Sequence, residues 1–212
     1  MRPGDWIHAF RPADGPPPHR LGAFFGWCLS GAWPMLGLAA AASAVGGTAE
    51  VLTALLLGRV IDTALAAGPG QVFSQHWPLL LGFAGFFLVA RPLLFGLSAA
   101  TNALVVQPNV MPLVLSRLHR WTMGQAVTFF DDDFAGRIAQ KQMQTARAVT
   151  DVTSETINVV AFALASLVGS ALLLTTIDAR IALALAVWLA AYLMLIRWFL
   201  PRVRVRSAKR AG

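Results

Sequence analysis

The stretch VTSETINVVAFALASLVGSALLLTTIDARIALALAVWLAAYLMLIRWFL, residues 152–200, decides the fold of this chain. A helix needs about 20 mostly apolar residues to cross a bilayer, and the runs 152–176 and 179–200 both qualify. The turn at Ile177 and Asp178 is so short that the two helices must form an antiparallel hairpin. Residues 152–200 therefore predict a pair of membrane-spanning helices.

Two earlier runs, residues 34–60 and 78–106, meet the same length criterion. Each begins with a proline, which is tolerated in the first turn of a helix because the N–H it lacks has no partner there. Of the 212 residues, 57% are hydrophobic and only 13% are charged, which is too apolar for a soluble domain. We therefore predict an all-α fold, a polytopic membrane helix bundle with four spanning helices and long cytoplasmic extensions.

The amino-terminal part differs in composition from the rest of the chain. Residues 1–20 are rich in proline and charge, which predicts a disordered cytoplasmic lead-in. Residues 21–33 are apolar and aromatic but too short to span, which favours an elbow helix lying at the membrane interface. Residues 34–212 then form the membrane domain.

Basic residues predict the orientation. Lys and Arg gather in residues 1–20, 107–151 and 201–212, whereas only Arg59 and Arg180 lie at the opposite ends of the spans. Because cytoplasmic loops carry the excess of Lys and Arg, both ends of the chain and the loop 107–151 are expected in the cytoplasm, with the spans in a bacterial plasma membrane. The net charge of +7 thus reflects topology and a lipid bilayer partner, and we expect no nucleic-acid binding.

The loop 107–151 is long and polar, yet its two arms show helical periodicity, with residues 125–135 as the bend. The tip contains the candidate site residues Thr128, Phe129, Phe130, Asp131, Asp132, Asp133, Phe134 and Gly136. Thr128 is expected to cap a short helix whose first turn receives the acidic run. The phenylalanines either dock on a partner surface or pack inside the hairpin that the two arms of the loop 107–151 form, or inside a dimer.

The order of Phe129, Phe130 and Asp131, then Gly136, then the basic Lys141 resembles the first intracellular loop of ABC exporter (type 1 ABC) transmembrane domains. The elbow, the short outer turn and the basic run after the last span agree, so the resemblance covers residues 21–212.

The chain also departs from that family's pattern. Gln144 and Thr145 stand where many members have Asn-Asp, and Arg137 replaces the usual acidic residue. Members have six membrane helices in each half, so the resemblance implies that residues 34–212 are a partial transmembrane domain and that the chain is a fragment.

Coupling to a nucleotide-binding domain, in the same or a separate chain, is the role that the resemblance implies for the tip residues 128–134 and 136. It also implies alternating access and a second transmembrane half in a homodimer or heterodimer. No G-x-x-x-x-G-K-[ST] loop occurs in the sequence, so we expect ATP and Mg²⁺ to bind another domain of the parent transporter and no cofactor to bind this chain. No catalytic grouping is evident, and the four histidines and Cys28 are too scattered to predict a metal site.

Glu50 and Arg91 form a candidate intramembrane ion pair. At 1.5 Å rise per residue they lie at similar depths, about 18 and 20 Å from the outer ends of adjacent antiparallel helices. They either line a substrate path or, as we prefer, neutralise each other between helices.

Two other functions remain open from the sequence. A non-transport four-helix sensor or scaffold would use the hairpin to recruit a protein, and a small channel would need a repeated polar stripe that no span shows.

Overall fold

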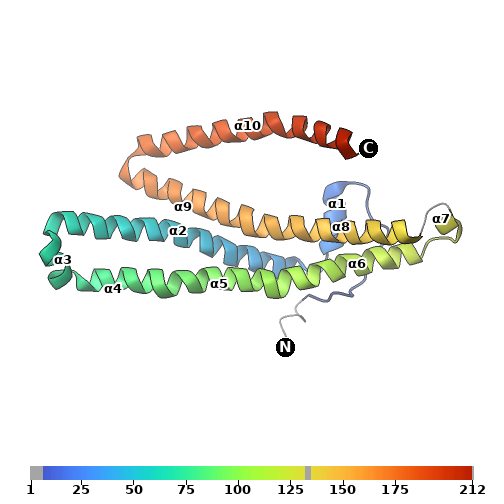
Figure 1. The fold of residues 1–212 in the computed structure, drawn as a ribbon, viewed down its shortest axis with the longest axis horizontal. Helices are drawn as coiled ribbons and strands as arrows, with labels where there is room; N and C mark the ends of the chain where they lie inside the picture. Colours follow the sequence, from blue (N-terminus) through green and yellow to red (C-terminus); the bar gives the residue numbers. More distant parts are fainter. Residues whose placement is uncertain (1–6, 132–134, 212) are drawn as a thin grey trace. The chain divides into compact units, whose positions relative to one another are not determined.

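The computed structural model describes residues 7–131 and 135–211, and the fold over these ranges consists of helices joined by short turns (Figure 1). The chain forms two compact units, Met1–Ser166 and Leu167–Gly212. By length and composition, four helices are able to cross a membrane: Trp33–Ala67, Trp77–Met123, Gly136–Ile177 and Ala179–Val203. The predicted all-α class is confirmed.

The first unit contains the elbow (residues 21–29), two long legs (33–67 and 77–106), the hairpin with the tip (107–155) and the start of a third leg (156–177). Its elements are α1 (Leu21–Leu29), α2 (Trp33–Ala67), α3 (Pro69–Gln75), α4 (Trp77–Gly85), η2 (Phe86–Ala90), α5 (Arg91–Thr101), η3 (Asn102–Val106), α6 (Gln107–Met123), α7 (Thr128–Asp131), α8 (Ala135–Glu155), η4 (Thr156–Ala161) and the start of α9 (Phe162–Ile177). Helix α2 packs on α5, and α6 packs on α8 as far as the tip (Figure 1).

The second unit contains the end of α9 and helix α10 (Ala179–Ala211), separated by Asp178 alone. The Asp178 carboxylate accepts a hydrogen bond of 2.8 Å from the backbone N–H of Arg180. Because the first N–H groups of a helix have no partner within it, this bond caps α10. Helix α10 continues through Pro201 and ends at Ala211, eleven residues beyond the predicted end of the span at residue 200.

Two π-helical segments interrupt the leg from α4 to α6. At η2 the N–H of Arg91 donates to the carbonyl of Phe86, five residues back, and Pro92 follows at once. Proline lacks an N–H, and its ring crowds the carbonyl four residues earlier, which the wider turn relieves. The same arrangement recurs at η3, ahead of Pro108. The leg therefore stays helical through both prolines.

Helices α2 and α9 approach each other closely at Gly47. A Cβ there would meet the carbonyl oxygen of Phe162 and lie 3.1 Å from the backbone nitrogen of Ser166. Ser43 and Ser98 join α2 to α5 through a bond of 2.8 Å between their hydroxyls. Small and hydroxyl-bearing residues thus determine how the helices pack. This is usual in membranes, because lipid tails are as apolar as the helices and the hydrophobic effect does not drive helix association there.

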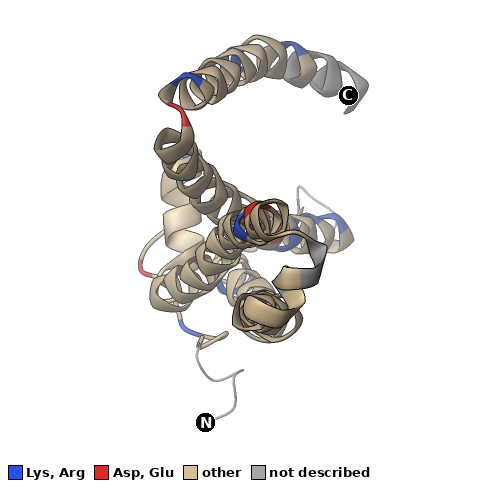
Figure 2. Cartoon of the chain, turned by 90° about the vertical axis from the view of Figure 1, so that its left-hand side faces the viewer, with Lys and Arg blue, Asp and Glu red and all other residues tan. Residues whose placement is uncertain are grey.

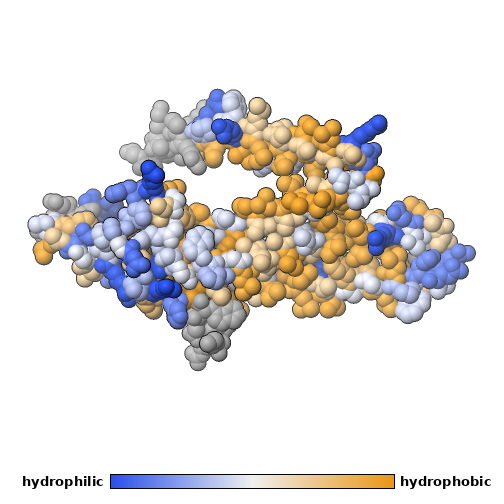
Figure 3. Space-filling view, turned by 180° about the vertical axis from the view of Figure 1, so that it is seen from behind, coloured by the Kyte–Doolittle hydropathy of each residue, from blue (hydrophilic) through white to orange (hydrophobic). Residues whose placement is uncertain are grey.

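The buried core and the exposed apolar surface lie in different parts of the first unit. Buried Cys28, Val110 and Leu113 belong to a core where α1, the start of α2, α6 and α8 meet. Along the legs, by contrast, Leu81 and Leu88 are 60% and 72% exposed. Hydrophobic side chains cover the middle of the first unit, and charged positions along the ribbons are few (Figures 2 and 3). Such a surface is suited to lipid.

Part of the lead-in predicted over residues 1–20 contacts the helices of the first unit. Residues 1–6 lie outside the described part, whereas residues 7–20 form no helix and Ile7 is buried. Ser116 of α6 donates to the carbonyl of Ala9 (2.9 Å), and Trp27 donates to that of Gly15 (3.3 Å). A proline-rich segment leaves its carbonyls unpaired, and here other elements supply donors.

The elbow also differs from its predicted range of 21–33. Helix α1 ends at Leu29, and α2 already begins at Trp33. Gly31, at φ 82°, makes the bend between them. A side chain there would be strained in this left-handed conformation and would crowd Arg11, whose Nη1 lies 2.9 Å from the Cβ position.

Candidate functional site

The tip of the hairpin presents apolar side chains to the surroundings. Phe129 lies in the short helix α7 with its ring edge-on to that of Phe130, 5.4 Å between centroids. Met123, Val127 and Phe129 are 66%, 78% and 46% exposed, and Phe130 is half-buried. We call Met123, Val127, Phe129 and Phe130 the apolar tip. The phenylalanines were singled out from the sequence, but Met123 and Val127 were not, although Val127 is an apolar residue of the predicted bend and Met123 lies two residues before it.

The remaining predicted tip residues are only partly visible. Thr128 is the first residue of α7, and Gly136 lies in the first turn of α8. Asp131 ends α7, but its side chain is not described, and Asp132, Asp133 and Phe134 lie outside the described residues.

The two arms behind the tip are joined along their length. Helix α6 packs on α8, and the amide of Gln142 donates to the hydroxyl of Thr122 at 2.7 Å. Ala146 and Val149 of α8 are buried in the same core as Leu113 of α6. The tip is therefore attached to two helices that pack against each other and continue into the long legs.

Arg117 of α6 is hydrogen-bonded to the elbow. Its guanidinium is 2% exposed and donates to the carbonyls of Arg11 (Nε, 3.1 Å), Trp27 (Nη1, 2.6 Å), Cys28 (Nη1, 2.9 Å) and Ser30 (Nη2, 2.7 Å). The carbonyls of Trp27 and Cys28 belong to the last turn of α1, which has no intrahelical partners for them. Arg117 thus caps α1 with a positive charge at its negative end.

Sequence analysis placed Arg117 among the basic residues of the cytoplasmic loop and missed this role. A signal was present, because Val110, Val114 and Arg117 follow one another at helical spacing and so share the apolar face of α6. A basic residue on an apolar face is the pattern expected of a buried donor.

Cys28 lies beside this cap and is fully buried. Burial raises the pKa of its thiol to about 11, and the nearby Arg117 cation opposes that shift only in part. The group therefore remains a neutral thiol at physiological pH and is a poor nucleophile.

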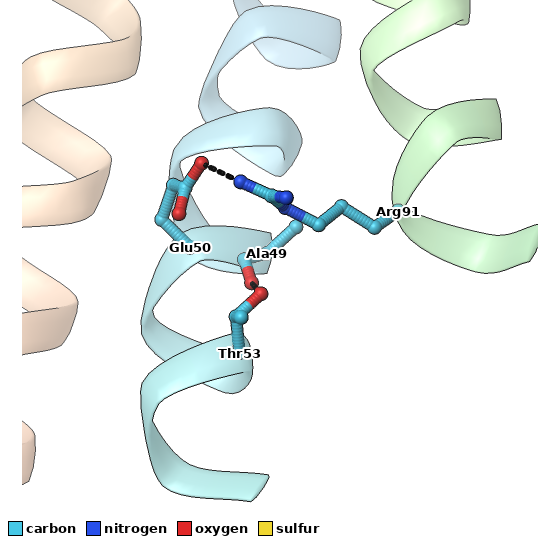
Figure 4. A network of polar contacts seen from close by, with 4 residues as sticks. All are labelled: Ala49, Glu50, Thr53 and Arg91. Carbon is cyan, nitrogen blue, oxygen red and sulfur yellow. Dashed lines mark hydrogen bonds and ion pairs between the residues drawn. The ribbon is translucent and has the colours of Figure 1, made fainter. Parts of the chain in front are cut away.

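Glu50 and Arg91 meet between α2 and α5, with Arg91 Nη2 2.6 Å from Glu50 Oε1 (Figure 4). The Arg91 guanidinium also lies over the rings of Phe87 and Phe95, 5.2 and 5.4 Å from their centroids. The side chains of Arg91 and Glu50 are 30% and 36% exposed, and Arg91 Nε has no hydrogen-bond partner among the described residues. The charge is thus balanced by one carboxylate and two aromatic faces.

Long apolar helices, lipid-suited surfaces and a balanced charge between two legs define a multi-pass helical membrane protein. The ABC transporter transmembrane region matches residues 36–212, well over half of the chain. This chain belongs to that family, which confirms the resemblance drawn from the tip and makes it the membrane part of an ABC transporter.

A protein of Haemophilus influenzae (strain ATCC 51907 / DSM 11121 / KW20 / Rd), described as an uncharacterized ABC transporter ATP-binding protein, is similar to this chain. The two are 26% identical over 166 residues, which is 78% of this chain and 27% of the relative. The chain therefore spans about a quarter of the length of that relative. No solved structure matches this chain.

Proposed function

We propose that this chain forms the substrate pathway of an ATP-driven exporter and receives the force of ATP hydrolysis through the apolar tip. The observation that carries the proposal is the exposure of Val127 and Phe129 at the end of two packed helices. Apolar side chains so placed favour a partner surface that covers them. In an ABC transporter, the partner that must act on the membrane part is the nucleotide-binding domain.

The proposed orientation puts the tip in the cytoplasm of a bacterial cell, with the spans in the plasma membrane. Five basic residues lie in the two arms (Arg117, Arg120, Arg137, Lys141 and Arg147), whereas Arg59 and Arg180 lie near the opposite ends of the spans. The positive-inside rule then puts both ends of the chain on the cytoplasmic side.

Partners complete the proposed machine. ATP and Mg²⁺ bind the nucleotide-binding domains, and a second transmembrane half, identical or different, closes the pathway. Closure of the nucleotide-binding domains pushes the tip, and the joined arms α6 and α8 move the legs between inward-open and outward-open states. The Glu50–Arg91 pair is proposed to neutralise charge between α2 and α5 rather than to bind substrate.

Truncation of the apolar tip tests this function. In the full transporter, Phe129→Ala should lower substrate-stimulated ATP hydrolysis while leaving the basal rate and the membrane level largely unchanged. Phe73→Ala is the matched control, because Phe73 is also an exposed phenylalanine (75%, against 46% for Phe129) and lies at the far end of the legs. Equal stimulation in both variants would count against coupling through the tip.

A further inference from the structure

A groove of about 350 Å³ lies behind the elbow, between α1, the start of α2 and the junction of α8 with η4. Phe25 and Leu29 of α1 form one wall, Leu36 and Gly37 of α2 the second, and Ile157 the third. The volume is within the range of about 300–1,000 Å³ typical of ligand sites. The groove is thus large enough for a segment of a ligand.

The lining selects an apolar occupant. Among the residues that the structure describes, no acidic or basic side chain lines the groove. Thr153, one of its two threonines, donates its hydroxyl to the carbonyl of Val149 at 2.7 Å and so needs no ligand acceptor. A charged or strongly polar ligand would lose its hydration in this groove without compensation.

The groove is continuous with the membrane surface of the protein. Leu36, Gly37 and Ala40 belong to the first turns of α2, which is one of the four helices able to span. Trp33 stands at the rim and is 56% exposed, in the position where aromatic side chains mark the interface between headgroups and hydrocarbon. We propose that the groove holds one acyl chain of a phospholipid from the leaflet next to the elbow.

Retention of the acyl chain depends on how well its shape fits the groove. An acyl chain in the bilayer is already in hydrocarbon, so entering the groove brings no further hydrophobic gain and must be favoured by close contacts. The walls supply these contacts because they are fixed: Leu29 and Leu36 are buried, and Arg117 ties down the last turn of α1. The bound lipid would stabilise the elbow against the legs.

Photolabelling with a phospholipid tests the proposal. The full transporter is reconstituted in vesicles of phosphatidylethanolamine and phosphatidylglycerol that contain a phosphatidylglycerol with a diazirine on one acyl chain. After illumination, labelled peptides are identified by mass spectrometry. We expect label on the peptides that contain residues 33–40 and 152–157, well above the label on other exposed parts of the legs.

Filling the groove should remove that label. Gly37→Trp places an indole in the groove from a glycine with open space around it, and Gly82→Trp makes the same change on the exposed face of α4. We expect Gly37→Trp to lose most of the label at the groove and Gly82→Trp to keep it. Ala40→Leu, a smaller filling change at the same groove, should reduce the label and keeps the test valid where the tryptophan variant fails to fold.

Two results would overturn the proposal. The first is label at the groove equal to that on other lipid-facing positions, or label unchanged in both filling variants. The second is a photocrosslinker at position 37 that joins to protein from another helix or a second copy, which would mean that protein covers the groove.

Discussion

Arg117 is a buried cation surrounded by backbone carbonyls, with no carboxylate within ion-pair distance among the described residues. A planar guanidinium can reach several carbonyls at once, whereas a lysine ammonium on the same helix cannot keep that spread of donors. The connection between α6 and the elbow therefore depends on the shape of the guanidinium as well as on its charge.

Arg117→Lys should loosen the elbow while preserving the charge. Unsatisfied carbonyls at the end of α1 cost about 1–3 kcal/mol, so α1 is expected to open more often. The readout is the labelling of Cys28 by a small maleimide at pH 8, which is slow in the parent protein because the thiol is buried and its pKa is about 11. Labelling becomes faster only if α1 opens.

The control for this change is Arg120→Lys, because Arg120 is exposed on the same helix. It should leave Cys28 labelling slow. Equal labelling rates in the parent protein and in Arg117→Lys would show that the guanidinium does not hold the elbow.

The second residue-scale prediction concerns the Glu50–Arg91 pair. Glu50→Gln leaves Arg91 without its carboxylate among apolar helices, which should cost about 2–3 kcal/mol and lower the amount of folded, inserted transporter. Combining Glu50→Arg with Arg91→Glu should restore part of that amount. Thermal stability in detergent and the membrane level of the full transporter are the measurements.

Glu155→Gln makes the same chemical change at an exposed position of α8 and should have little effect. Normal insertion of Glu50→Gln together with an altered substrate preference would instead favour a role in the substrate path.

At the scale of elements, helix ends and interruptions were harder to predict than the helices themselves. Hydropathy marks the part of a helix that lies in hydrocarbon, so the predicted span 34–60 stopped short of the end of α2 at Ala67. The π segments at η2 and η3 relieve Pro92 and Pro108, whose clashes depend on the backbone of the preceding turn. Apolar periodicity alone does not predict that backbone geometry.

Gly47 provides an element-scale prediction because it sets the approach of α2 to α9. Gly47→Ala adds a methyl group against the backbone of Phe162, and overpacking of this kind costs about 1–3 kcal/mol. Gly58→Ala has open space and should gain up to about 1 kcal/mol of helix propensity. Unfolding midpoints of the two variants should therefore move in opposite directions, and a stabilised Gly47→Ala would refute the close contact.

For the whole molecule, the sequence was sufficient for the fold class and the family, because long apolar runs and the order of Phe129, Phe130, Asp131 and Gly136 are local features. The contacts of the lead-in and the Arg117 cap were not predicted, since each joins residues far apart in the chain, as Ser116 and Ala9 do. The meeting of Glu50 and Arg91 was expected from depth alone, whereas their aromatic neighbours Phe87 and Phe95 follow from the packed structure.

We propose that an ATP-hydrolysing domain binds the tip of the hairpin from inside the cell. The most direct measurement is site-specific photocrosslinking in intact cells from position 129 of the full transporter, with position 73 as the control. We expect a crosslink from position 129 to the nucleotide-binding domain and none from position 73. A position 129 that crosslinks to no nucleotide-binding surface, or that joins to proteins outside the cell, would contradict the proposal.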